Sequence, residues 1–95
     1  MGKVKKLLET AEASVFLKTN EIVKRNIRIG DTRTSVTLEP QVWNILKQVS
    51  EEHECNVHQL CEMINERKNP ASSLASAIRV FLISYLQIKY SKLKR

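Results

Sequence analysis

The chain has 95 residues, of which 42% are hydrophobic and 27% are charged. This composition indicates one small globular domain and excludes a low-complexity or disordered chain. Two cysteines are too few for a disulfide framework. The sequence shows no apolar stretch typical of a signal peptide and no apolar run near the roughly 18 residues that span a bilayer. We therefore expect a cytoplasmic protein that does not contact a membrane.

The net charge of +6 is distributed unevenly along the chain. Residues 1–38 carry eight Lys and Arg against four Asp and Glu, and residues 72–95 carry five basic and no acidic residues. Residues 39–71 carry three basic and six acidic residues. The basic ends are suited to attracting phosphate groups, whereas the acidic middle indicates helices that do not all face such groups.

The first expected element is a helix over residues 3–18. Its apolar residues recur at helical spacing and leave the charged residues on the other side (Val4, Leu7, Leu8, Ala11 and Val15). Further along, Ile27 and Ile29 flank Arg28 just before a Gly-Asp turn signal. This pattern leaves two interpretations of residues 26–30, a short strand or an extended arm.

A short strand is predicted over residues 33–38, where side chains of two kinds alternate. One face carries Arg33, Ser35 and Thr37, and the other face carries Thr34, Val36 and Leu38. The segments that follow are helical, so this strand has no downstream partner. A lone strand leaves its backbone groups unpaired, and we therefore expect it to pair with the same strand of a second copy. The product is a two-stranded antiparallel ribbon with a polar, cationic face.

Three helices are predicted after the strand. The first begins near Pro40, whose missing N–H is harmless in a first turn. The second follows Asn56, which is a good N-cap, and the third follows Ser72 or Ser73. Each helix has an apolar stripe at spacings of three and four residues, and the stripe of the third is wider than a surface helix needs.

The order strand, helix, tight turn, helix resembles the ribbon-helix-helix superfamily of DNA-binding proteins. The similarity rests on Thr34-Ser35-Val36-Thr37-Leu38-Glu39 with Trp43 and Leu46, on Leu60 and Ile64, and on Ser-Ser-Leu-Ala-Ser-Ala-Ile-Arg-Val-Phe at residues 72–81. These segments are similar to a bacterial branch of the superfamily. The resemblance implies a mostly α fold with one short β-strand, assembled as a homodimer around an intermolecular two-stranded ribbon, with extra N-terminal and C-terminal helices.

The resemblance also implies a division of the chain and a function. An N-terminal helix and linker would occupy residues 1–26, the ribbon-helix-helix core residues 27–67, and the C-terminal helix with its basic tail residues 68–95. The implied function is that of a homodimeric, sequence-specific transcriptional regulator, a repressor, that inserts its ribbon in the major groove of double-stranded DNA. It requires no cofactor.

Three groups of residues receive roles from the resemblance. The outward residues of the ribbon would contact base edges (Arg33, Ser35 and Thr37). The start of the second predicted helix after the strand would contact phosphates (Asn56, Val57 and His58). By their charge rather than by the resemblance, the basic residues before the strand are further candidates for phosphate contacts, with a solvated surface as the alternative (Lys24, Arg25 and Arg28). Apolar residues from the strand and the helices would form the dimer core (Val36, Leu38, Trp43, Leu46, Leu60, Ile64 and Phe81).

Other functions have weaker support in the sequence. His53, Cys55, His58 and Cys61 are possible zinc ligands by type, but the first two are spaced too closely and Cys61 lies on an apolar stripe, so we expect no metal site. No phosphate-binding Gly-rich loop or recognisable catalytic set indicates an enzyme. The alternative is an antitoxin-like interaction module, which uses the same core as a dimerisation scaffold and binds a protein partner through the N-terminal helix.

Overall fold

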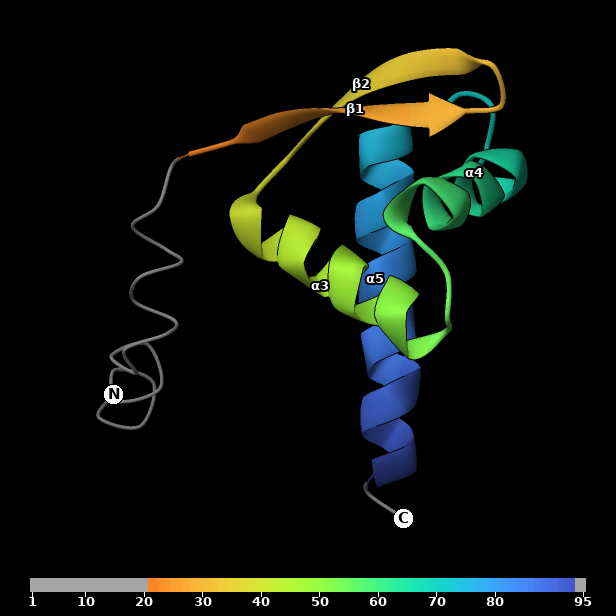
Figure 1. Cartoon of the computed structure of the whole chain (residues 1–95). Coiled ribbons are helices and arrows are strands. Elements are labelled where there is room, and N and C mark those ends of the chain that lie inside the picture. The colour runs from red at the N-terminus through yellow and green to blue at the C-terminus, as the bar shows by residue number, and fades with distance from the viewer. Residues whose placement is uncertain (1–20, 94–95) are drawn as a thin grey trace.

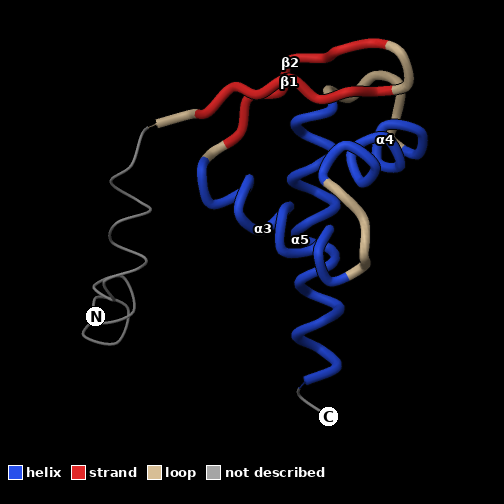
Figure 2. Tube along the Cα trace, in the orientation of Figure 1, coloured by secondary structure: helices blue, strands red, loops and turns tan. Residues whose placement is uncertain are grey.

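The computed structural model describes residues 21–93, and the helix expected over residues 3–18 lies outside this range. Two strands, β1 (Val23–Ile29) and β2 (Thr32–Leu38), precede three helices, α3 (Pro40–Glu52), α4 (Val57–Arg67) and α5 (Leu74–Leu93). The strands form a hairpin that lies across one end of the helical part (Figure 1). The three helices lie on one side of this hairpin, which leaves its other face uncovered by them (Figure 2).

The hairpin joins two strands of the same chain. β1 and β2 pair antiparallel, from Val23 opposite Leu38 to Ile29 opposite Thr32. Gly30 is the first residue of the two-residue turn and has a φ of 59°, which glycine adopts without the steric cost that other residues incur. A glycine with positive φ at this position is typical of a type II′ hairpin turn, whose twist matches that of the strands.

The expectation of one short strand is therefore wrong, and residues 26–29 belong to a second strand that ends at the turn. The sequence of β1 predicts a strand only weakly, because three of its seven residues are basic. The strand forms nevertheless, because Ile27 is buried and the ladder with β2 pairs its backbone groups. Because β1 occupies one edge of β2, that edge does not need a second copy. The other edge of β2 has no strand partner within residues 21–93, and pairing there between two copies stays a prediction.

The hydrophobic core lies between the inner face of the hairpin and the three helices. Its buried apolar residues come from all five elements (Ile27, Val36, Leu38, Trp43, Leu46, Val49, Leu60, Cys61, Ile64, Leu74, Ile78 and Leu82). Six residues expected in a dimer core are thus already buried within one chain (Val36, Leu38, Trp43, Leu46, Leu60 and Ile64). The apolar face of β2 is covered by its own helices.

The helices begin at the residues that the sequence indicates. Pro40 is the first residue of α3. Asn56 caps α4 in a capping box, in which its Oδ1 accepts from the backbone N–H of Gln59 at 2.8 Å and its own N–H donates to Gln59 Oε1 at 2.9 Å. Ser73 directly precedes α5, and its Oγ accepts from the backbone N–H of Ser76 in the first turn at 3.1 Å. These caps fix where each helix starts relative to the hairpin.

Two carboxylates of the α3 region fasten it to α5. Arg79 donates to Glu39 just before α3, with its Nη2 2.8 Å from Oε1. At the other end of α3, Glu52 accepts from Lys89 Nζ at 2.8 Å and from the Tyr85 hydroxyl at 2.7 Å. The bond from Arg79 lowers the pKa of Glu39, and the bonds from Lys89 and Tyr85 lower the pKa of Glu52.

Substitution of Gly30 by alanine tests the turn. Gly30→Ala should reduce the free energy of unfolding by about 1–2 kcal/mol, because an L side chain is strained at positive φ. A Cβ at this position would meet no atom within 4 Å, so the cost comes from the backbone alone. Chemical denaturation followed by circular dichroism measures it. Asp31→Ala is the control and should change stability by less than about 0.5 kcal/mol; equal effects of the two substitutions would contradict this turn.

Acid should weaken the attachment of α3 to α5. Because the pKa values of Glu39 and Glu52 lie below their usual value of 4.5 in the folded chain, their stabilisation is complete above pH 4.5 and is lost as the pH falls through the lowered values. We expect the midpoint of urea unfolding to decrease as the pH falls below 4.5. The double variant E39Q/E52Q should be less stable at neutral pH and should lose less stability in acid. An acid dependence unchanged by the double substitution would refute the assignment to these carboxylates.

Candidate nucleic-acid interface

The face of the hairpin that is turned away from the helices is polar and cationic. Cross-strand neighbours point to the same side of a sheet, so the register decides which side chains share this face. Its six exposed side chains form three cross-strand pairs, which are Lys24–Thr37, Asn26–Ser35 and Arg28–Arg33. We call this surface the ribbon face. It carries three cations and no carboxylate, and it contains every residue that was expected to contact bases.

The pair Arg28–Arg33 opposes two like charges across the ladder. Like charges that face each other directly destabilise a sheet, and neither guanidinium forms an ion pair with a residue of the described part of the chain. A local arrangement that opposes stability is more typical of a binding site than of a structural element. An anion placed between the two guanidinium groups would relieve this repulsion.

α4 is attached to the edge of β1 next to the ribbon face. The backbone N–H of Arg28 donates to His58 Nδ1 at 3.0 Å, and the backbone N–H of Gly30 donates to Glu62 Oε2 at 2.9 Å. His58 and Glu62 are one turn apart on α4; His58 binds the end of β1, and Glu62 binds the turn that follows it. These two bonds hold the first turn of α4 beside the tip of the hairpin. A recess of about 350 Å³ lies where α4 meets the hairpin, and it is lined by Asn26, Arg28, Arg33 and His58.

The first turn of α4 has backbone donors to offer. The capping box engages the N–H groups of Asn56 and Gln59, and the N–H groups of Val57 and His58 have no acceptor within residues 21–93. Free N–H groups at a helix N-terminus, together with the helix dipole, favour an anion. The residues expected to contact phosphate at this helix are therefore beside the ribbon face.

The three basic residues of β1 do not share one environment. Lys24 and Arg28 lie on the ribbon face, whereas Arg25 lies on the opposite face with its guanidinium 5.2 Å from the centre of the Trp43 ring. Trp43 Nε1 in turn donates to the carbonyl of Val23 at 2.9 Å. Arg25 thus covers a buried aromatic ring, and a cation–π contact accounts for its position.

Asn26 is a residue of the ribbon face that the sequence analysis did not single out. Ser35 Oγ donates to Asn26 Oδ1 at 3.1 Å, which holds the two side chains together at the centre of the face. The sequence does contain a pattern that places Asn26 on the polar side, because Ile27 and Ile29 alternate with the polar residues Asn26 and Arg28. Only the pairing with β2 shows that this alternation belongs to a strand.

The two histidines among the four possible zinc ligands have separate hydrogen-bond partners. His53 Nε2 lies 2.9 Å from the Tyr85 hydroxyl, and His58 accepts from Arg28. Burial of Cys61 raises the pKa of its thiol to about 11, so the thiolate that zinc requires is disfavoured. Within residues 21–93, no group of three His, Cys, Asp or Glu side chains is arranged to hold a metal ion.

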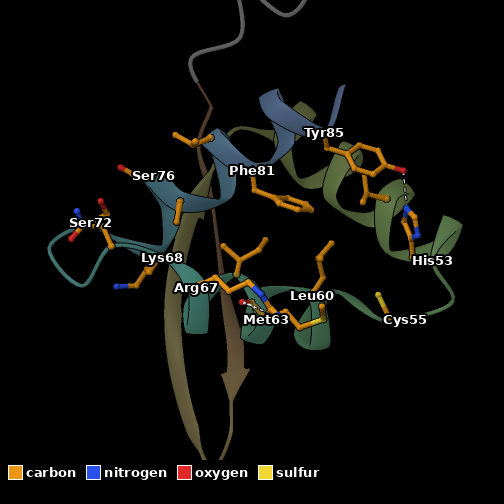
Figure 3. A pocket seen from close by; sticks show the side chains of 15 residues that line it. His53, Cys55, Leu60, Met63, Arg67, Lys68, Ser72, Ser76, Phe81 and Tyr85 are labelled. Atoms are coloured by element: carbon orange, nitrogen blue, oxygen red, sulfur yellow. Dashed lines mark hydrogen bonds between the residues drawn. The ribbon is translucent and has the colours of Figure 1, made fainter. Parts of the chain in front are cut away.

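A second surface lies on the helical side, in a groove of about 800 Å³ between α4 and α5 (Figure 3). Three residues expected in a dimer core line this groove, namely Leu60, Ile64 and Phe81. Six of the eight large apolar side chains that are exposed in the described range belong to α5 (Val80, Ile83, Leu86, Ile88, Tyr90 and Leu93). One chain alone therefore leaves this helix incompletely covered. No helix within residues 21–93 is long and apolar enough to cross a membrane.

Amide hydrogen exchange tests the attachment of α4 to β1. His58→Ala should accelerate exchange at the Arg28 amide and leave Gly30 protected, and Glu62→Ala should accelerate Gly30 alone, because each variant removes one acceptor. Nuclear magnetic resonance resolves the two amides separately. Faster exchange at both amides in each variant would show that α4 detaches as a unit, and unchanged exchange would show that these bonds are absent.

Comparison with known proteins agrees with this architecture. A family model described as a ribbon-helix-helix domain matches residues 22–86, which include both strands, α3, α4 and most of α5. An uncharacterized protein from Bordetella pertussis Tohama I has a similar structure, with a TM-score of 0.66 and 24% identity over 88% of this chain and 74% of that chain. No curated protein matches the sequence significantly. Because the family model spans more than half of its length, the chain belongs to the ribbon-helix-helix domain family.

Proposed function

We propose that this protein is a homodimeric, sequence-specific DNA-binding regulator that represses transcription by occupying a promoter. The observation that carries this proposal is the ribbon face, which presents three cations, hydroxyl groups and an amide on an exposed two-stranded ribbon. Membership of the ribbon-helix-helix family supports DNA as the partner. Such a protein would act in the cytoplasm, where a bacterial chromosome is found.

The ribbon face has the dimensions and chemistry for the DNA major groove, which admits a two-stranded β-ribbon. Arg33 can donate two hydrogen bonds to guanine, and Ser35 and Thr37 can contact base edges through hydroxyl or methyl groups. Lys24 and Arg28, on the flanking strand, supply positive charge for phosphates. The first turn of α4 would meet the phosphate backbone at the groove wall and fix the position of the ribbon.

The second copy is proposed to cover the groove between α4 and α5. Leu60 and Ile64 form part of its floor and Phe81 part of its wall, and the exposed apolar residues of α5 continue from it. A stable interface needs about 800 Å² from each partner, and hydrogen bonds along a strand edge alone supply little apolar area. Since each protomer carries a complete hairpin, the dimer would read two half-sites.

Substitutions on the ribbon face should separate base reading from phosphate binding. Arg33→Ala should lower the affinity for a specific site by about 1–3 kcal/mol and relax the preference at one base pair, because it removes a bidentate contact. Lys24→Ala should weaken binding to all sequences alike and reduce the slope of log affinity against log salt by about 1. Fluorescence anisotropy on matched and mismatched duplexes measures both. Lys47→Ala, on the exposed side of α3, is the charge-matched control and should leave affinity unchanged.

Selection of bound duplexes from random DNA tests the proposal as a whole. The dimer should enrich a repeated half-site, and its spacing reports how the two hairpins are arranged. Protein that enriches no sequence and shifts no duplex at low salt is not a DNA-binding regulator.

The alternative function is the antitoxin-like interaction module. The groove between α4 and α5 supports it, because an apolar surface of this kind can bind another protein. Deletion of residues 1–20 separates the two functions, since β1 begins at Val23 and must be retained. A co-purifying partner that is lost with this segment, together with unchanged DNA binding, would indicate a combined role.

A further inference from the structure

The hairpin gives the ribbon face a strand that lies outside the strand-helix-helix order recognised in the sequence. β1 contributes Lys24, Asn26 and Arg28 to this face, each opposite a residue of β2. Asn26 stands at its centre, between the other two along β1. It is the one carboxamide among the six side chains of the ribbon face.

We propose that Asn26 is a base-reading residue that selects adenine in the major groove, an inference that rests on the proposed function. Adenine presents N7 as an acceptor and its N6 amino group as a donor, and a carboxamide can satisfy both at once. Arginine favours guanine for the same geometric reason. Each hairpin therefore selects an adenine in the same half-site as the guanine bound by Arg33.

Ser35 prepares Asn26 for this contact. Ser35 Oγ donates to Asn26 Oδ1 at 3.1 Å, which fixes the orientation of the amide. A carbonyl oxygen accepts two hydrogen bonds, so Oδ1 retains one lone pair for the adenine amino group, and Nδ2 retains both of its donors. An amide that is already oriented loses less conformational entropy when it binds.

A structural role does not explain Asn26. Its side chain is exposed, and its hydrogen bond joins it to another exposed side chain. The neighbouring residues Arg25 and Ile27 point to the other face, where they contact Trp43 and the core. Substitution of Asn26 should therefore leave the fold intact, so a change in DNA binding by the variant reports the loss of a DNA contact.

The experiment selects bound duplexes from a random pool with the full-length chain and with three variants. Asn26→Ala removes the reader, Ser35→Ala removes its orienting partner, and Asn44→Ala makes the same amide deletion on the exposed side of α3. The wild type and Asn44→Ala should enrich one half-site with a fixed adenine. Asn26→Ala should retain the rest of the half-site and use all four bases at that position, and Ser35→Ala should weaken the adenine preference.

Affinities on two duplexes complete the test. On the selected site, Asn26→Ala should bind roughly 5- to 150-fold more weakly than the wild type, the range for loss of one bidentate base contact. On a site with that adenine replaced, the two proteins should bind equally. Thermal unfolding of both proteins should coincide.

Each other outcome overturns the inference. An unchanged half-site for Asn26→Ala, a uniform loss of affinity on all sequences, or a fixed base other than adenine would refute adenine reading by Asn26 and leave the proposed function standing. A wild-type chain that enriches no DNA would refute the proposed function as well.

Discussion

The antiparallel pairing of β1 with β2 is the constraint on which the rest of the structure depends. Its register, set by a tight turn at Gly30, divides the side chains of both strands between two faces. One face supplies Ile27, Val36 and Leu38 to the core, and the other presents only polar and basic groups. A shift of one residue in this register would exchange the two faces and remove both the core contacts and the ribbon face.

The same pairing explains how a charged surface is held in place. Arg28 faces Arg33 across the ladder, which opposes hairpin stability, while the backbone of Arg28 and Gly30 is held by His58 and Glu62 of α4. Apolar packing beneath the hairpin and the bonds to α4 offset the repulsion above it. The surface is thus formed within one chain, and the first-turn amides of α4 lie next to its cations.

Much of this architecture is predictable from sequence. Pro40, Asn56 and the serines before α5 indicate the helix starts because capping is a local property, and the alternation from Arg33 to Leu38 shows which side chains face outward.

What was not predictable depends on contacts distant in sequence. The basic residues of β1 conceal a strand whose stability comes from its ladder with β2 and from the burial of Ile27. Without that strand, Asn26 has no assigned face, and Arg25 cannot be distinguished from Lys24 as a candidate for phosphate binding. The attachment of His58 to the edge of β1 also depends on how α4 returns to the hairpin.

Amide chemical-shift mapping during titration with duplex DNA tests the central claim most directly, since it reports which surface meets the nucleic acid. The account predicts that the largest changes fall on the residues of the ribbon face and on the first turn of α4, with small changes along α5. Largest changes along α5 and its groove, or none anywhere at low salt, would contradict it.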